Sequence, residues 1–268
     1  MNGETRFVPH WYDAGMPETK LQICKNADAL AARAADVIVA AARQAIAERG
    51  RFTLVLSGGS TPEKTYRLLA ARERSAQIDW ARTFLFFGDE RCVPPEDPAS
   101  NFGMARRSLL DSVQVPQSNV FPTPTVGVSP AAGAAAYGHT MAQFFAIEPD
   151  TFPPPRFDLV LLGLGDDGHT ASLFPGKPAV HVADQWVTWS PPGVLPPPVD
   201  RITLTFPVLN AARQVVFLVA GEKKAQVLRE VLEDNPPADK YPAAGVRPVK
   251  GTLTWLIDEL AASKLTRR

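Results

Sequence analysis

A mostly apolar run that stops at a glycine-rich polar turn constrains this chain more than any other segment. Residues 157–162 read FDLVLL, and GLGDDGH follows directly at 163–169. A short, continuous apolar run is typical of a strand buried on both faces of a parallel sheet. Open α/β sheets bind ligands at the carboxyl ends of their strands, and Asp166, Asp167 and His169 lie at such an end. The turn therefore predicts a functional site, with His169 as the side chain suited to move a proton near neutral pH.

Helical and strand-like segments alternate along the rest of the chain. The predicted helices are 26–49, 62–72, 101–110, 130–147, 223–233 and 256–265, and the predicted strands are 52–56, 83–87, 157–162, 186–189, 201–206 and 214–220. Such alternation is typical of a doubly wound, mostly parallel α/β sheet flanked by helices. We expect one α/β domain over residues 1–268 with a small additional lobe, an N-terminal extension at 1–20 and a proline-rich loop region at 179–200.

Composition and charge argue against several classes of partner. The chain has 28 lysines and arginines against 28 aspartates and glutamates, so we expect no nucleic acid to bind. Its apolar runs are too short to cross a bilayer, so no membrane partner is expected. Two cysteines, Cys24 and Cys92, do not make a disulfide framework, which favours a cytoplasmic protein. Neither HExxH nor paired CxxC occurs, so no metal site is expected.

The glycines of the polar turn also match a dinucleotide-binding fingerprint. Gly163, Gly165 and Gly168 fit GxGxxG, a loop that should approach a pyrophosphate and open a helix. Here two carboxylates would face that pyrophosphate, and Pro175 would cut the helix short. These two conflicts disfavour a dinucleotide site.

A second candidate stretch of small residues follows the predicted strand at 52–56. Its members are Ser57, Gly58, Gly59, Ser60 and Thr61. Small residues let main-chain amides approach an anion, Thr61 suits a helix cap and Pro62 suits the first helical position. The amino end of a helix attracts phosphate, so the stretch predicts a phosphate site. An ordinary strand-to-helix turn is the alternative, and the pattern is neither a Walker loop nor a GxSxG nucleophile elbow.

Charged residues at the ends of other predicted strands are the remaining candidates. They are Asp89 and Arg91 after 83–87, Arg201 at the start of 201–206, and Lys223 and Lys224 after 214–220. Arginine and lysine are the usual partners of phosphate. Asp89 and Arg91 fit either a loop ion pair or a pocket wall, whereas Asn101 is expected to cap the helix that it begins. We expect these groups and His169 to face one crevice.

Six sequence blocks, taken together and in order, resemble the 6-phosphogluconolactonase family. They are LSGGSTP at 56–62, DERCVP at 89–94, SNFGMARRSLL at 100–110, GLGDDGHTASLFP at 163–175, RITLTFPVLNAAR at 201–213 and GEKKAQVL at 221–228. The resemblance implies an α/β fold related to that of glucosamine-6-phosphate deaminase. It also implies hydrolysis of 6-phospho-D-glucono-1,5-lactone to 6-phospho-D-gluconate in the oxidative pentose phosphate pathway, without a cofactor. A monomer and a homodimer are both compatible with it.

The resemblance further implies roles for individual residues. His169 matches the family's general base, and Asp167 precedes it in the DGH pattern. Positions that match phosphate or substrate contacts are Ser57, Gly58, Gly59, Ser60, Thr61, Asp89, Arg91, Arg201 and Lys224. Lys223 is left as an alternative to Lys224. In this hypothesis His169 takes a proton from the water that attacks the lactone carbonyl, and a phosphorylated sugar lactone is the partner.

Two other functions stay open on sequence alone. A deaminase-type sugar-phosphate isomerase would use Asp89 to shuttle a proton and His169 to assist ring opening. Against it, TASLFP at 170–175 lacks the glutamate that the deaminase pattern places just after its histidine. A non-catalytic sugar-phosphate sensor would bind the same ligand, but the chain shows no DNA-binding segment of the kind that such regulators usually carry.

Overall fold

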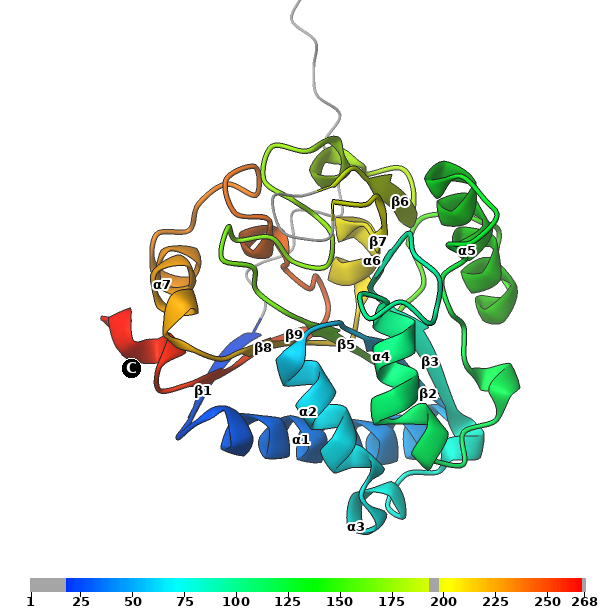
Figure 1. Cartoon of the computed structure of the whole chain (residues 1–268), viewed down its shortest axis with the longest axis horizontal. Coiled ribbons are helices and arrows are strands. Elements are labelled where there is room, and N and C mark those ends of the chain that lie inside the picture. Colours follow the sequence, from blue (N-terminus) through cyan, green and yellow to red (C-terminus); the bar gives the residue numbers. More distant parts are fainter. Residues whose placement is uncertain (1–17, 193–197, 267–268) are drawn as a thin grey trace, which may run out of the picture.

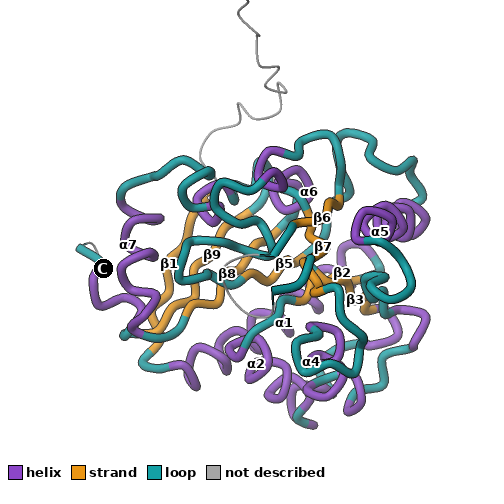
Figure 2. The backbone as a smooth tube through the Cα atoms, turned by 45° about the horizontal axis from the view of Figure 1, so that its top comes forward, coloured by secondary structure: helices purple, strands orange, loops and turns teal. Residues whose placement is uncertain are grey.

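A six-stranded, entirely parallel sheet forms the centre of the computed structural model, which describes residues 18–192 and 198–266. In spatial order its strands are β1 (Glu18–Cys24), β9 (Thr252–Asp258), β8 (Gln214–Val219), β5 (Leu159–Leu162), β2 (Phe52–Leu56) and β3 (Thr83–Phe87). Helices lie on both sides of the strands (Figure 1, Figure 2). The doubly wound α/β fold expected from the sequence is confirmed.

The central strands are buried on both faces because successive residues point into different cores. One core lies under α1 (Ala27–Arg49), α2 (Ser60–Ala70) and α4 (Asn101–Ser108), and the other under α5 (Pro130–Phe145), α6 (Phe206–Ala211) and α7 (Ala225–Glu233). On β2, Leu54 enters the first core and Val55 the second, and on β3 the same holds for Leu85 and Phe86. This double burial explains why the central strands are rich in apolar residues.

A second, three-stranded antiparallel sheet forms the small additional lobe that the sequence predicts. Its order is β4 (Asp89–Arg91), β7 (Arg201–Leu204) and β6 (Val187–Ser190). Only Gly88 separates β4 from β3, so the chain runs directly from the main sheet into this lobe. In the register of the lobe, Arg91 stands opposite Arg201.

The prediction for the last element is wrong. Residues 256–265, expected as a helix, form the second half of β9 and a 3₁₀ turn at Ala261–Lys264. Alanine and charged residues favour a helix locally, but Leu256 and Ile257 are fully buried where β9 pairs with β1 and β8. Burial between two strands outweighs local propensity here. The ends of the other predicted elements differ from the observed ones by at most two residues.

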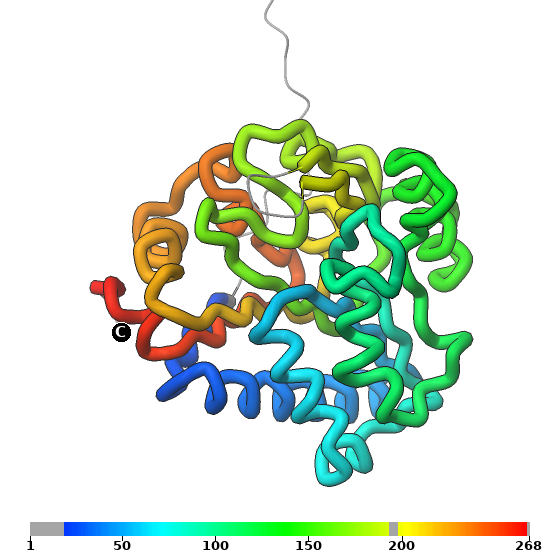
Figure 3. The backbone as a smooth tube through the Cα atoms, in the orientation of Figure 1, coloured from blue at the N-terminus to red at the C-terminus, as the bar shows by residue number. Residues whose placement is uncertain are grey.

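The predicted N-terminal extension at 1–20 needs a correction where the structure describes it. Residues 18–20 belong to β1, whose parallel pairing with β9 runs from Glu18 to Cys24. The first and last strands, blue and red in Figure 3, therefore lie side by side. The rest of the predicted extension, residues 1–17, lies outside the described residues, as do 193–197 of the proline-rich region. No helix in the described part of the chain is long and apolar enough to span a membrane.

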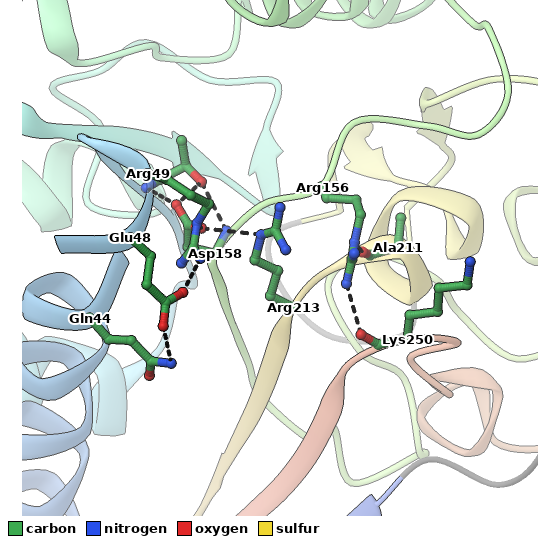
Figure 4. Close-up of polar contacts among 9 residues, drawn as sticks. Gln44, Glu48, Arg49, Arg156, Asp158, Ala211, Arg213 and Lys250 are labelled. Carbon is green, nitrogen blue, oxygen red and sulfur yellow. Dashed lines mark hydrogen bonds and ion pairs between the residues drawn. The ribbon is translucent and has the colours of Figure 1, made fainter. Parts of the chain in front are cut away.

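A charged cluster ties together the edge of the sheet at which the central strands begin (Figure 4). Asp158, directly before β5, accepts hydrogen bonds from the main-chain amide and the hydroxyl of Thr53 and from Nε of Arg49, each at 2.8 Å. Nε of Arg213 lies 3.5 Å from the same carboxylate. Arg156 is held nearby by two main-chain carbonyls.

The opposite edge of the sheet contains the topological switch point. After β2 the chain continues outward to β3, whereas after β5 it continues in the other direction to β8, although β2 and β5 are neighbours. Ligands of doubly wound sheets bind in the crevice that such a reversal opens at the carboxyl ends of the strands. The two loops beside this crevice are the SGGST stretch after β2 and the GLGDDGH turn after β5.

Candidate active site

The two loops at the switch point border a cleft of about 270 Å³. The predicted site residues that line it are Ser57, Gly58, Gly59, Ser60, Thr61, Asp89, Arg91, His169 and Lys224. Asn101, expected only as a helix cap, lines it as well. Asp167 and Arg201 are not among the described residues that line the cleft. Four separate strand ends thus contribute to one site, as the sequence predicts.

The loop after β2 presents the amino end of α2 to the cleft. The main chain of Ser57 is fixed by the hydroxyl of Tyr66, which donates to its carbonyl and accepts from its amide, both at 2.9 Å. Contrary to the prediction, Thr61 is not the cap: the helix begins at Ser60, and Gly59 is the N-cap residue. Glycine has no side chain to occupy the first amides of the helix, which have no partner inside it. These amides are suited to hold a phosphate.

Asn101 connects this loop to the DER segment. Its side chain donates to the main-chain carbonyl of Asp89 at 2.8 Å and accepts from Nη1 of Arg91. A Cβ atom on Gly58 would lie 1.9 Å from its Oδ1, so only glycine allows this close approach. The cap of α4 is instead Ser100, whose hydroxyl accepts from the amide of Gly103 at 2.9 Å. Of the adjacent residues Ser100 and Asn101, the first is the cap, and the second faces the cleft.

Two buried carboxylates fix the wall of the cleft on the β4 side. Asp89 accepts a hydrogen bond from the hydroxyl of Ser172 at 2.7 Å. Glu90 accepts four, from the amides of Arg91, Asn101 and Phe102 and from the hydroxyl of Ser100. Burial raises the pKa of Glu90, and the three amide donors lower it in part. Glu90 therefore joins β4 to the start of α4, a role that the sequence analysis missed.

The turn after β5 holds the imidazole of His169 in a fixed position. Nδ1 of His169 lies 2.5 Å from Oδ1 of Asp167, and the amide of Gly165 donates to the carbonyl of His169 at 2.8 Å. The ring packs against Phe174, with centroids 4.7 Å apart. Because an ionised carboxylate only accepts hydrogen bonds, Nδ1 is the nitrogen that donates to Asp167, and Nε2 is the nitrogen left to accept a proton from a substrate or water. That arrangement suits a general base.

Asp167 is held in its ionised form. Burial alone would raise its pKa, but the hydrogen bond from His169 and its charge lower the pKa below the ordinary value. The contribution of this carboxylate to stability is therefore complete above the ordinary aspartate pKa of about 3.9 and is lost as the pH falls through the lower pKa of the folded state. We expect Asp167→Asn to lower the thermal midpoint at neutral pH, with the difference from wild type shrinking below about pH 4. Calorimetric scans from pH 2 to 8 measure this; a difference that grows in acid would contradict it.

Gly165 is required for the imidazole to occupy its observed place. A Cβ atom there would lie 2.0 Å from Nδ1 of His169 and 2.6 Å from Oδ1 of Asp167. We expect Gly165→Ala to displace the ring and to lower kcat about 10²-fold, since a shift of about 1 Å has that effect. Gly138→Ala is the matched control, because a Cβ built at Gly138 has no atom within 4 Å apart from its chain neighbours and the backbone of its own helix. Equal activity of the two variants would show that the ring position is not critical.

Arg201 and the lysine pair are placed differently relative to the cleft. Arg201 is 3% exposed, and its guanidinium lies 5.2 Å from the centroid of Phe174, the ring that supports His169. Burial, followed by the charge of Arg91, lowers the pKa of Arg201. Of the two lysines, Lys224 lines the cleft.

No group of three or more His, Cys, Asp or Glu side chains within 18–192 and 198–266 is placed to hold a metal ion.

The fold and the cleft together define a class of doubly wound α/β proteins with a polar cleft at the switch point. A family model described as glucosamine-6-phosphate isomerases/6-phosphogluconolactonase matches residues 25–255, and the chain belongs to this family.

Several relatives of known name are 6-phosphogluconolactonases. A 6-phosphogluconolactonase from Synechocystis sp. is 42% identical over 246 residues, covering 92% of this chain and 98% of the relative. One from Rattus norvegicus is 44% identical over 221 residues, covering 81% and 82% of the two chains. The solved structure of a 6-phosphogluconolactonase from Trypanosoma cruzi is similar with a TM-score of 0.83 and 31% identity, over 95% of this chain and 99% of that one.

Proposed function

We propose that this protein hydrolyses 6-phospho-D-glucono-1,5-lactone to 6-phospho-D-gluconate, a reaction of the oxidative pentose phosphate pathway, with His169 as the general base. One observation carries the proposal. His169, which is paired with Asp167, lines the same cleft as the amino end of α2 and Lys224. A base and an anion site in one cleft suit a substrate that has a reactive carbonyl at one end and a phosphate at the other.

Hydrolysis of a lactone needs few catalytic groups because the ester is already activated. Nε2 of His169 takes a proton from water as the water oxygen attacks the carbonyl carbon, and then gives a proton to the ring oxygen as the ring opens. Asp167 stabilises the imidazolium that forms in between. Such positioned acid–base catalysis contributes about 10²–10⁴-fold. Arg91, which lines the cleft, supplies positive charge for the developing oxyanion.

Proton release tests the proposed activity directly. Opening the lactone yields a carboxylic acid that ionises, so freshly generated 6-phosphogluconolactone should acidify a weakly buffered solution faster with the protein than without it. The spontaneous rate, which rises with pH, is subtracted at each pH. Because His169 must be neutral to act as a base, the enzymatic rate should fall in acid. A rate equal to the spontaneous one throughout would refute the proposal.

Lys224 should matter for the phosphate and little for the lactone ring. Loss of a charge-assisted hydrogen bond costs about 1.5–3 kcal/mol, or roughly 10- to 100-fold. We expect Lys224→Met to lower kcat/KM by that factor for the phosphorylated lactone and far less for unphosphorylated glucono-1,5-lactone. Lys223→Met is the matched control, because its neighbour Lys224 lines the cleft and Lys223 does not. Equal losses on both lactones would exclude a phosphate role for Lys224.

A deaminase would use the same cleft, but its product, ammonia, distinguishes it from a lactonase. Residues 170–175, TASLFP, follow His169 without the glutamate expected of a deaminase. We therefore expect no ammonia from glucosamine-6-phosphate under conditions in which the lactone is hydrolysed. Ligand-induced thermal stabilisation without turnover of either substrate would favour the sensor.

A further inference from the structure

We propose that Asp166 promotes release of the product by competing with it for Lys224. The inference rests on the proposed lactonase reaction and concerns a residue to which that reaction assigns no step. Oδ1 of Asp166 lies 2.5 Å from Nζ of Lys224. Lys224 lines the cleft and its side chain is 25% exposed, whereas that of Asp166 is 51% exposed. The cation expected to hold the phosphate thus already has a carboxylate partner within the protein.

Asp166 and its chain neighbour Asp167 contact two different side chains that line the cleft. Its neighbour Asp167 contacts the imidazole of His169, at the end where the carbonyl reacts. Asp166 itself contacts Lys224, at the end expected to take the phosphate. One of two consecutive carboxylates therefore contacts the proposed base, and the other contacts the lysine that lines the same cleft.

The reaction adds a negative charge to the ligand, and this charge changes how strongly the ligand interacts with Asp167 and Lys224. Water adds its oxygen to the carbonyl carbon, the bond from that carbon to the ring oxygen breaks, and one proton ends on the new hydroxyl. The other proton leaves as the acid ionises. Product therefore carries one negative charge more than substrate, and the new carboxylate forms beside His169 and Asp167. Like charges within a few ångströms repel.

Competition for Lys224 follows from this change. A substrate with charge only on its phosphate can share Lys224 with Asp166. The product is in addition repelled at its other end by Asp167, so its hold on Lys224 is weaker and Asp166 regains the lysine. Because Asp166 is half exposed, its electrostatic effect is moderate, in the range of exposed ion pairs.

Product affinity without turnover tests the inference. We expect Asp166→Asn to bind 6-phosphogluconate about fivefold more tightly than wild type in titration calorimetry, which corresponds to the upper value for an exposed ion pair. The inhibition constant of the product should fall by the same factor, and the difference should shrink with added salt. Asp166→Glu retains the charge and should behave as wild type. Inorganic phosphate, which has no second charge for Asp167 to repel, should gain less affinity than 6-phosphogluconate in Asp166→Asn.

Asp28 provides a matched control. Its carboxylate lies 2.5 Å from Nζ of Lys64, a pair of the same chemistry and length whose two members do not line the cleft. Asp28→Asn should leave product affinity unchanged. Equal affinity of wild type and Asp166→Asn, or an equal gain in Asp28→Asn, would overturn the inference. Failure of the wild type to accelerate proton release would instead overturn the proposed function, because calorimetry requires no catalysis.

Discussion

His169→Asn is expected to lower the enzyme-catalysed hydrolysis of 6-phosphogluconolactone about 10²–10⁴-fold, the usual contribution of a positioned acid–base group. Asparagine fills a similar space but cannot take a proton from water. The pair with Asp167, in which Nδ1 and Oδ1 lie 2.5 Å apart, holds the imidazole in one orientation. Initial rates of proton release, corrected for spontaneous hydrolysis, measure the loss. Affinity for inorganic phosphate should change little, because the amino end of α2 is intact.

Another histidine of the chain supplies the control. Nε2 of His181 lies 2.9 Å from Oδ1 of Asp239, which is also a pair of histidine and aspartate, but neither residue lines the cleft. His181→Asn should therefore retain wild-type turnover. If His169→Asn also retained it, the base would have to be sought elsewhere in the cleft, and the proposed mechanism would be lost.

Much of the site could be predicted from the sequence because the strands of a parallel sheet end at the same edge, where ligands bind. A strand buried on both faces is a continuous apolar run, as in β5, and such a run ends where the ligand edge of the sheet begins. Polar residues directly after β2, β3 and β5 therefore had to lie close together, although Ser57 and His169 are far apart in the chain. The order of the strands was not needed for this conclusion.

What the sequence did not reveal depends on contacts between distant segments. Asn101 and Glu90 look like a cap and a loop acid, and only the approach of α4 to β4 gives them their partners. The pairing of β7 with β4 buries Arg201 against the ring of Phe174, a contact that the sequence does not show, and the phosphate role of Arg201 stays a prediction. In β9, local helix propensity pointed the wrong way because the pairing with β1 and β8 is decided by tertiary structure.

The second large effect concerns stability and lies at the other edge of the sheet. We expect Asp158→Ala to lower the free energy of unfolding by about 3 kcal/mol or more, the loss typical of a broken buried ion pair. The substitution removes the acceptor of Arg49 and of Thr53 and the carboxylate next to Arg213, and it leaves Arg49 with Glu48 as its remaining acidic partner. Burial, followed by the charges of Arg213 and Arg49, already lowers the pKa of Arg156. Urea unfolding monitored by circular dichroism measures the change.

An ion pair between the same atom types at the surface is the control that distinguishes the effect of burial from the effect of charge on stability. Nε of Arg74 lies 2.9 Å from Oδ1 of Asp36, close to the 2.8 Å between Arg49 and Asp158, but the side chain of Asp36 is 53% exposed against 7% for Asp158. Asp36→Ala should cost at most about 1 kcal/mol, since water replaces the lost partner. Because Asp158 lies at the edge away from the cleft, folded Asp158→Ala should keep its turnover. Equal destabilisation by the two substitutions would mean that the buried carboxylate does not hold the β2 and β5 strands together at their amino ends.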